Sequence, residues 1–250
     1  MLRSRIIPCL LMREQGLVKT RQFGDAKYVG DPLNAVKIFN EKAVDELMFL
    51  DIDASTKQSE PNFPFLKKLA VESRMPLCYG GGIKTARQAA QTIAIGFEKV
   101  SISSAAVHRP ELIAEVADAV GSQSVVVTVD VRKNRFLPGY TVFTQNGRDE
   151  KKVNLVEFCQ QVVALGAGEV VINSIDRDGE MKGYDLELAK IVRSAVSSPI
   201  TMLGGAGSPN DMQALIDAVG VVGAGAGSMF VFKGVYRAVL ISYSRPDRLN

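Results

Sequence analysis

The chain of 250 residues has no tryptophan, one histidine and three cysteines. Cys9, Cys78 and Cys159 are far apart and form no CxxC pair, and the first two lie in apolar runs. We therefore expect reduced thiols in the core of a cytoplasmic protein, with neither disulfides nor a zinc site. With His108 as the single histidine, the sequence predicts no metal and no cofactor.

Long apolar runs and a strong net charge are also absent. The apolar run near the N-terminus gives way to charged residues after about six positions, which is too short for a signal peptide or a membrane span. The net charge of +3 is too small to indicate a nucleic-acid partner or a membrane surface. What is present is a chain with 46% hydrophobic residues that is long enough to bury a large core.

Short apolar runs alternate with helix-like segments along the chain. Continuous apolar strands separated by helices indicate a parallel sheet covered by helices. Eight such units predict a single α/β domain over residues 1–250, a (β/α)8 barrel. An open doubly wound sheet is the alternative, although eight parallel strands would be many for it. The expected strands cover residues 5–11, 46–52, 75–80, 99–103, 124–130, 169–175, 199–204 and 221–227.

The two halves of the chain resemble each other. The motifs "YGGGI" and "LGGAG" lie 124 residues apart, and Asp53 and Asp176 lie 123 apart. This repeat predicts two half-barrels, at about residues 1–120 and 121–250. Leu11 then corresponds to Asp130, with an offset of 119 that a loop of variable length explains.

Two long polar loops, at residues 13–31 and 132–152, follow the first and fifth expected strands. In a barrel of this kind, both lie on the face where the strands end, which carries the active site. We interpret residues 21–32 as a mobile lid and residues 139–148 as a small hairpin. Long loops at this face usually cover a substrate.

Glycine clusters open the helices after the third and seventh strands, and a small hydroxylated loop accompanies each cluster. Glycine lets the backbone approach an anion closely, and N–H groups at a helix start bind it. We predict two phosphate cradles for a small molecule phosphorylated at both ends, with tight turns alone as the alternative. The first cradle comprises Gly81, Gly82, Ser103 and Ser104, and the second Gly204, Gly205, Gly227 and Ser228.

The motifs "RIIPCL", "DELMFLDIDAS", "YGGGI", "KVSISSAA", "GSQSVVVTVD", "NSIDRDGEMKGYD" and "GGAG" follow one another in this order. Together they resemble the cyclase subunit of imidazole glycerol phosphate synthase (HisF) over essentially the whole chain. The resemblance implies a lyase/cyclase-type subunit of a glutamine amidotransferase. A HisH-type glutaminase would dock on the N-terminal face, and ammonia would pass through the barrel to a bisphosphorylated substrate that is cleaved and cyclised.

The family's catalytic pair is two aspartates at the ends of the first and fifth strands. Asp130 matches the second aspartate, and Leu11 stands in place of the first. Moving protons in both directions requires two groups of different protonation state, which Leu11 cannot supply. Glu14 is a candidate replacement from the following loop. We expect Asp130 to remain the main proton-transfer or ligand-orienting group, with a pKa raised by its apolar neighbour.

The resemblance also implies substrate contacts. Lys19 matches a substrate-contacting lysine of the family, with a solvated loop lysine as the alternative. Asp176 ends the sixth strand and is expected to contact ligand. Asp51 either orients Lys19 or the ligand, or is a buried structural aspartate. Ser103 stands where the family typically has an asparagine. We interpret His108 as a surface residue at a helix start, and Cys9 as a packed thiol.

Four charged residues of balanced sign stand at strand starts, where side chains line the barrel floor: Arg5, Glu46, Lys99 and Glu169. The resemblance makes this ring an ammonia gate. An ion-pair plug that only closes the floor is the alternative. Glu98, next to the ring, is expected to help dock the partner.

The stretches "IPCLLMREQGLVKT" and "KGVYRAVLISYS" look especially similar to HisF-like paralogues of bacterial surface-polysaccharide (O-antigen) pathways. Those paralogues imply a HisH-like glutaminase and a separate sugar amidotransferase, which turns an acetamido group into an acetamidino group. The alternatives are an ordinary cyclase of histidine biosynthesis, a related phosphosugar isomerase, and a non-catalytic scaffold that activates the glutaminase.

Overall fold

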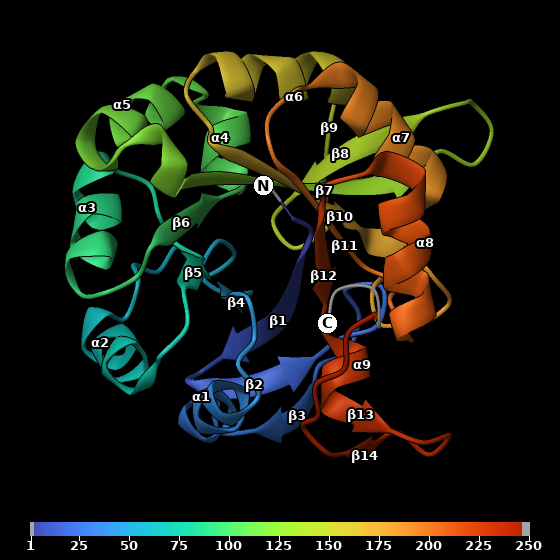
Figure 1. Ribbon diagram of the computed structural model, residues 1–250. Coiled ribbons are helices and arrows are strands. Elements are labelled where there is room, and N and C mark those ends of the chain that lie inside the picture. The colour runs from blue at the N-terminus through green and yellow to red at the C-terminus, as the bar shows by residue number, and fades with distance from the viewer. Residues whose placement is uncertain (1–2, 247–250) are drawn as a thin grey trace.

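The computed structural model describes residues 3–246. Within this range, eight parallel strands close into a barrel, and helices lie around its outside (Figure 1). Each barrel strand pairs with the next, and the last pairs with the first. The (β/α)8 barrel expected from the sequence is confirmed. The barrel strands are β1 (Arg5–Arg13), β4 (Leu47–Asp51), β5 (Leu77–Gly80), β6 (Lys99–Ile102), β7 (Val125–Lys133), β10 (Glu169–Ser174), β11 (Ile200–Leu203) and β12 (Gly223–Ala226).

The middles of the strands are mostly apolar because both of their faces are buried, and most of the charged residues lie toward the strand ends. Alternate side chains point to opposite sides of a strand, which divides the core in two. One apolar cluster lies between strands and helices and includes Ile6, Leu10 and Phe49. The other fills the inside of the barrel and comprises Ile7, Cys9, Met48, Cys78, Val126, Val171 and Leu203. All three cysteines are buried free thiols, as expected from the sequence.

The helices follow the strands and begin with side-chain caps in most cases. Asp31, Thr85, Asn154, Asp185 and Ser208 each accept a backbone N–H of the first turn. Among the described residues, no helix is long and apolar enough to cross a membrane. The helices are α1 (Pro32–Glu41), α2 (Phe63–Glu72), α3 (Ala86–Ala94), α4 (Ser104–His108), α5 (Glu111–Val120), α6 (Leu155–Ala164), α7 (Leu186–Ala195), α8 (Pro209–Val219) and α9 (Ser228–Val231), with short 3₁₀ turns η1 (Ser122–Ser124) and η2 (Ile175–Arg177).

The two long loops contain added strands. The first was interpreted as polar loop and lid, but β2 (Gly16–Lys19) and β3 (Lys27–Gly30) form an antiparallel extension of β1. The second contains the expected hairpin, as β8 (Tyr140–Thr144) and β9 (Asp149–Lys151). Because β1 and β7 pair with these additions, both strands run past the ends expected from the sequence.

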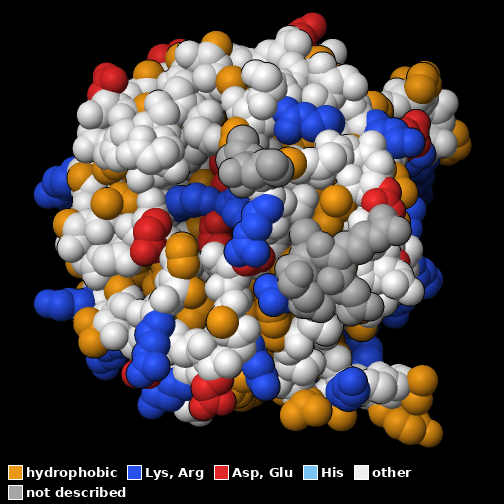
Figure 2. Space-filling model, viewed as in Figure 1, with side chains coloured by type: hydrophobic (Ala, Val, Ile, Leu, Met, Phe, Trp, Pro, Cys, Tyr) orange, Lys and Arg blue, Asp and Glu red, His pale blue; other side chains and the backbone are white. Residues whose placement is uncertain are grey.

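The eighth unit differs from the others because α9 has only four residues. A small hairpin follows, formed by β13 (Phe232–Lys233) and β14 (Ala238–Val239). Its turn exposes Val235 and Tyr236, which are 91% and 93% accessible. Figures 1 and 2, drawn from the same side, show this hairpin projecting at the lower right with hydrophobic side chains outward.

The strand registers repeat between the halves of the barrel. Leu11 pairs with Leu50 on the next strand, as Asp130 pairs with Asn173. Leu50 and Asn173 lie 123 residues apart, and so do Gly81 and Gly204. This offset is one residue shorter than the 124 residues between the two glycine motifs. An origin from two half-barrels stays a prediction.

Candidate functional site

A cavity of about 380 Å³ opens at the end of the barrel where the parallel strands finish. Its wall combines residues from the ends of all eight strands and from the two long loops. Most of the residues predicted from the sequence meet there. They are Leu11, Lys19, Asp51, Gly81, Gly82, Ser103, Ser104, Asp130, Gly204, Gly205, Gly227 and Ser228.

Asp130 lies near the end of β7, with its carboxylate on the cavity wall. The side-chain amide of Asn173, on neighbouring β10, donates a hydrogen bond to it over 2.9 Å. Burial raises the pKa of Asp130 to about 7, against a lowering by the Asn173 hydrogen bond, and the charge of Asp178 raises it further. The direction of shift expected from the sequence is confirmed. A carboxyl group that titrates near neutrality can both give and take a proton.

Leu11 stands at the corresponding position of β1 and is 8% exposed. Its side chain forms an apolar part of the wall together with Leu50 and Leu203. Glu14 does not replace the missing carboxylate in this arrangement. Its side chain is 78% exposed, pairs with Lys57 over 3.1 Å, and is not part of the wall. The cavity wall is therefore apolar at Leu11, the position of β1 that corresponds to Asp130.

The first predicted cradle follows β5. Gly81 and Gly82 have φ angles of +132° and +71°, a region that favours glycine. A Cβ on Gly81 would lie 2.7 Å from the Cβ of Asp51, so the backbone passes close to β4. Ser103 and Ser104 lie opposite at the start of α4, and the hydroxyl of Ser104 accepts the N–H of Gln145. Backbone and hydroxyl groups thus line this side of the cavity.

The second predicted cradle follows β11 and β12. Gly204 and Gly205 also have positive φ angles, +95° and +108°. Gly227 has an ordinary φ of −116°, but a Cβ there would overlap the ammonium group of Lys19. Glycine at this position therefore lets the end of the Lys19 side chain lie directly against the backbone.

Lys19 is 5% exposed and lines the same cavity from the end of β2. The only hydrogen bond found for its ammonium group among residues 3–246 goes to the carbonyl of Cys9, over 3.4 Å. A buried ammonium group normally has a charged or strongly polar partner. Lys19 is thus placed to bind an anion beside Gly227, and the interpretation as a solvated lysine is wrong.

The acidic residues predicted to contact ligand divide into two groups. Asp51 lines the cavity, and burial raises its pKa above the ordinary value while the N–H of Asp53 opposes the shift. Asp176 is not part of the wall. Its carboxylate accepts the N–H of Lys133 over 2.8 Å and pairs with Arg132, so it supports the end of β7 instead.

Asp178, two residues later, occupies the place that Asp176 was expected to fill. Its carboxylate accepts the hydroxyl of Thr20 over 2.6 Å and the N–H of Phe23 over 3.2 Å. A further ion pair joins Arg21 to Glu180, and its hydrogen bonds lower the pKa of Glu180 to about 2. These contacts tie residues 20–23, part of the predicted lid, across the mouth of the cavity.

Cys9 and His108 have the modest roles expected from the sequence. Burial raises the pKa of Cys9 to about 12, so its thiol stays protonated at neutral pH. His108 is the last residue of α4 rather than the first of a helix, and it is exposed at the rim of the cavity.

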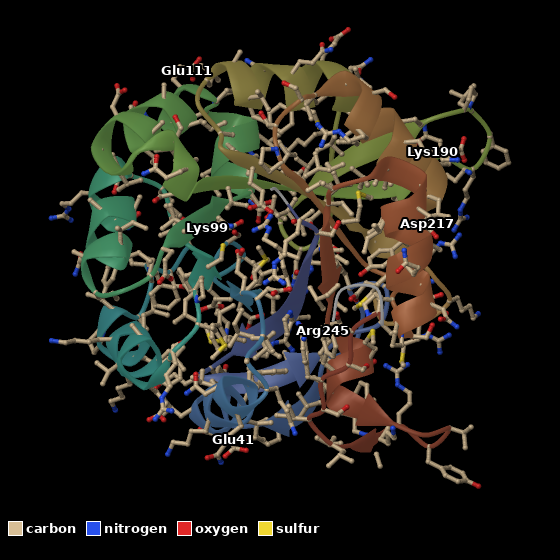
Figure 3. The ribbon with its side chains drawn as sticks, in the orientation of Figure 1. Glu41, Lys99, Glu111, Lys190, Asp217 and Arg245 are labelled. Carbon is tan, nitrogen blue, oxygen red and sulfur yellow. The ribbon has the colours of Figure 1, made fainter. Side chains whose placement is uncertain are left out.

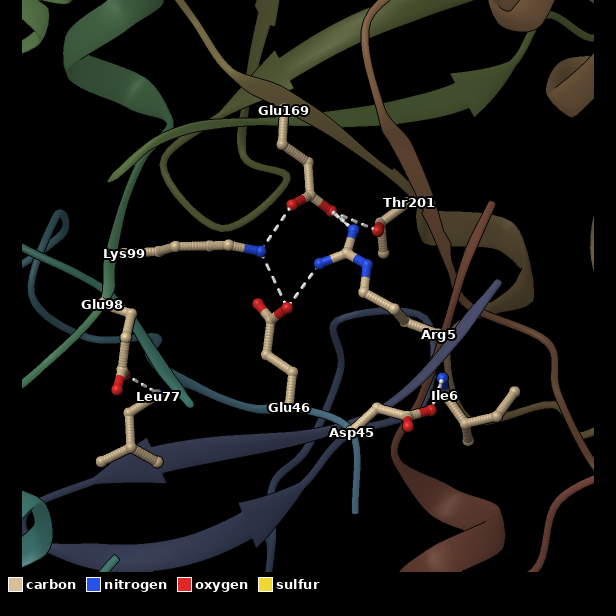
Figure 4. Close-up of polar contacts among 9 residues, drawn as sticks. All are labelled: Arg5, Ile6, Asp45, Glu46, Leu77, Glu98, Lys99, Glu169 and Thr201. Carbon is tan, nitrogen blue, oxygen red and sulfur yellow. Dashed lines mark hydrogen bonds and ion pairs between the residues drawn. The ribbon is translucent and has the colours of Figure 1, made fainter. Parts of the chain in front are cut away.

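At the opposite end of the barrel, four charged side chains converge (Figure 4). Arg5 contacts Glu46 at 2.5 Å and Glu169 at 2.6 Å. Lys99 contacts the same two carboxylates, at 2.8 and 2.9 Å. The predicted ring therefore closes completely. In Figure 3 Lys99 points inward from β6, whereas Glu41 and Glu111 lie on the surrounding helices.

The ring carboxylates are deeply buried. Burial alone would raise the pKa of Glu169, but Arg5 and Lys99 outweigh it and hold the pKa below the ordinary value. The hydroxyl of Thr201 also donates to Glu169. One oxygen of Glu46 has no hydrogen-bond partner among the described residues. Charged side chains of both signs gather near the centre of this face in Figure 2.

Glu98, expected to help dock a partner, accepts the backbone N–H of Leu77 over 2.6 Å. Its carboxylate thereby fixes the start of β5 next to the ring. Docking through Glu98 stays a prediction.

The interior between ring and cavity is narrow and mostly apolar. Ile7, Met48, Cys78, Val126 and Val171 form the layer above the ring, and each is at most 2% exposed. In the next layer, Ser101 and Thr128 share a hydrogen bond of 2.6 Å. This polar pair lies between the apolar layer and Asp130, which follows Thr128 by two residues on β7.

Comparison with known proteins gives the family. A model described as "Histidine biosynthesis protein" matches residues 5–237, and the chain belongs to this family. A Vibrio vulnificus protein is 54% identical over 247 residues, which cover 99% of this chain and 95% of that protein. Its name provisionally describes it as imidazole glycerol phosphate synthase subunit hisF3.

Two further relatives differ in their names and in their sequence identity to this chain. A Pseudomonas aeruginosa protein, provisionally named imidazole glycerol phosphate synthase subunit hisF2, is 49% identical over all of this chain and 99% of its own length. The HisF subunit of imidazole glycerol phosphate synthase from Alkaliphilus metalliredigens is 41% identical over 84% of this chain and 83% of its own. The predicted relationship to the HisF family is thereby confirmed.

Proposed function

We propose that this protein is an ammonia-conducting synthase subunit of a glutamine amidotransferase whose substrate is not the histidine-pathway intermediate. It works in the cytoplasm with a HisH-type glutaminase that docks at the ring. The ammonia serves the amidination of an acetamido sugar in surface-polysaccharide (lipopolysaccharide) biosynthesis, together with a separate sugar amidotransferase. The cavity takes a phosphorylated small molecule.

The observation that carries this proposal is Leu11. In support of it, four charged side chains meet at the barrel floor, and the glycines predicted for the cradles, Lys19 and Asp130 line a cavity whose wall is apolar at Leu11. Removing a general acid or base commonly lowers a rate by about 10²–10⁴-fold. A cavity that lacks this carboxylate fits a different reaction better than the cyclisation that needs two carboxylates.

Two other functions are supported by particular observations. An ordinary histidine-pathway cyclase is favoured by the plain names of relatives that are about 40% identical to this chain. A non-catalytic scaffold that activates the glutaminase is favoured by Leu11 alone. A phosphosugar isomerase fits less well, because that reaction has no use for a ring at the barrel floor.

The first test supplies the purified protein and its glutaminase with the histidine-pathway bisphosphate intermediate and ammonium salt. Supplying ammonia directly separates the chemistry from its passage through the barrel. We expect no imidazole product from the wild type, and measurable product from Leu11→Asp, which restores the second carboxylate. Normal turnover by the wild type would make this a histidine enzyme.

A second assay follows amidination of an acetamido sugar by the assembled system with glutamine. We expect Asp130→Asn to lower the rate by about 100-fold or more. An unchanged rate would favour the scaffold.

A further inference from the structure

The C-terminal hairpin brings a guanidinium group to the second cradle. Arg237 lies in the turn between β13 and β14, at the far end of the sequence from Lys19. Its Nη1 donates to the carbonyl of Gly179 over 2.9 Å, and its Nη2 approaches the hydroxyl of Ser228 at 3.5 Å. Gly179 and Ser228 both line the cavity.

The local structure fixes Arg237 in this place. Its φ is +50°, a conformation that a non-glycine residue seldom adopts, and its N–H closes a turn onto the carbonyl of Gly234. The guanidinium lies over the ring of Phe232, 4.5 Å from the ring centre. Phe232 is itself 5% exposed. A side chain held by a strained turn and a buried ring is pre-positioned for its contacts.

The charge of Arg237 has no acidic counterpart. Within the described residues, no carboxylate pairs with its guanidinium, whose contacts are a carbonyl, a hydroxyl and a ring. Lys19, on the other side of Gly227, likewise has no carboxylate within ion-pair distance among residues 3–246. Two cations therefore flank the Gly227–Ser228 turn without an anion between them.

The contact also determines which way the hydroxyl of Ser228 points. A guanidinium group can only donate hydrogen bonds, so the oxygen of Ser228 must accept from Arg237. The hydroxyl proton is then free to be donated elsewhere. Ser228 is 5% exposed and lines the cavity, so its hydroxyl is available to donate a hydrogen bond to an anion there.

We propose that Arg237 is a positioning residue of an anion site for a phosphate monoester at the second cradle. Lys19 contacts the phosphate directly, and Arg237 orients the donor hydroxyl of Ser228 and adds the second positive charge. This inference rests on the phosphorylated ligand of the proposed function and adds a residue of the C-terminal hairpin to its site.

The test uses the full chain, labelled with ¹⁵N and titrated with inorganic phosphate. The amide shifts of Gly205 and Gly227 report the second cradle, and those of Gly81 and Gly82 report the first in the same experiment. We expect Arg237→Gln to weaken phosphate binding about tenfold at the second cradle only, since a positive charge and a donor to Ser228 are lost together. Arg237→Lys keeps the charge and should recover part of the affinity.

Lys233→Gln is the matched control, because it removes one positive charge from an exposed position of the same hairpin. We expect it to change affinity less than twofold. In the double variant with Ser228→Ala, Arg237→Gln should add a smaller loss than it causes in the wild type, since only the contribution of its charge is left to remove. A role limited to stabilising the hairpin would instead give additive losses.

The outcomes distinguish the role proposed for Arg237 from the second phosphate cradle itself. Wild-type affinity in Arg237→Gln, an equal loss in Lys233→Gln, or additive losses in the double variant would overturn the role of Arg237. If Lys19→Met and Ser228→Ala also bind phosphate as the wild type does, or if the wild type shows no shift at Gly205 and Gly227, the second cradle itself is wrong.

Discussion

Replacing one carboxylate by a leucine changes the task of the carboxylate that remains. Among residues 3–246, Asn173 is the one hydrogen-bond donor found for Asp130, and the cavity wall that it shares is apolar at Leu11 and Leu50. Burial therefore dominates its titration and raises its pKa to about 7. A single group that is half protonated near neutrality can serve in turn as acid and base, where two groups would otherwise share the work.

This pKa predicts how stability depends on pH. Between its ordinary value of 3.8 and the raised value of about 7, the folded chain keeps a proton that the unfolded chain has lost. The unfolded state then binds fewer protons, so stability falls as pH rises through this range. A shift of about three units corresponds to about 4 kcal/mol at most. Asp130→Asn has no carboxyl group to titrate at this position, so it removes this fall in stability with rising pH.

Urea unfolding of the wild type and Asp130→Asn at pH 4 and pH 8 measures the effect. We expect similar stabilities at pH 4 and a more stable variant at pH 8. Comparing the two proteins cancels the titration of other groups. A difference between them that stays the same at both pH values would mean that Asp130 titrates normally.

Single residues also show where sequence reasoning stops. Asp130 and the cradle glycines line the cavity as predicted, because they lie at or directly after the ends of predicted strands, whereas Lys19 was predicted from the family resemblance. Asp176 was expected in the cavity, but the chain turns into η2 straight after β10. This tight turn directs Asp176 toward β7 and brings Asp178 to the cavity. Arg237 could not be found in advance, since its contact with Ser228 depends on a hairpin with no marked pattern.

At the scale of elements, polar and charged side chains stand both where the barrel strands start and where they finish. The strand starts deliver the ring, and the parallel register fixes its members at one level. Arg5, Glu46, Lys99 and Glu169 were foreseen because each begins an apolar run. The strands β2 and β3 were not, because the loop that contains them is polar and shows no clear alternation. Pairing with β1 outweighs the weak intrinsic β-strand preference of this segment.

The ring predicts a specific loss of stability. Glu169 is 4% exposed and contacts both cations, so Glu169→Gln leaves two positive charges facing one carboxylate. Removing one partner of a buried ion pair costs about 3–5 kcal/mol, and we expect about 3 kcal/mol here because the amide keeps hydrogen bonds. Chemical denaturation at neutral pH measures it.

The control for this variant is Glu115→Gln, which breaks an exposed pair with Arg109. We expect it to change the unfolding free energy by about 1 kcal/mol at most. Equal effects of the two variants would mean that the ring stabilises no more than a surface pair does.

The lowered pKa of Glu169 also gives the ring a pH dependence. The carboxylate stabilises the fold fully above its ordinary pKa of 4.5, and this contribution is lost as the pH falls through the lowered pKa.

For the whole molecule, the barrel axis connects two faces with different tasks. Under the proposed function, ammonia enters the barrel at the ring and leaves it at the cavity. Between them lies the layer of Ile7, Met48, Cys78, Val126 and Val171. Filling this layer should therefore separate the two faces without altering either.

Val171→Phe tests this passage. The larger side chain fills the interior, and overpacking costs about 1–3 kcal/mol of stability, which a barrel of this size can tolerate. In the assembled system, we expect glutamine-driven turnover to fall more than tenfold while ammonium-driven turnover stays within about twofold of the wild type. The ammonium-driven rate shows whether the variant is folded. A parallel fall of both rates would contradict passage along the axis.

The apolar layer also sets the charge of whatever crosses it. An ammonium ion would lose its hydration there without gaining a partner, whereas neutral ammonia loses much less. Under the proposed function, each crossing is therefore electroneutral, and the proton that ammonium would have carried stays on the side of the ring. A reaction at the far end then needs another proton source, and the carboxyl group of Asp130, which titrates near neutrality, lies on the cavity wall.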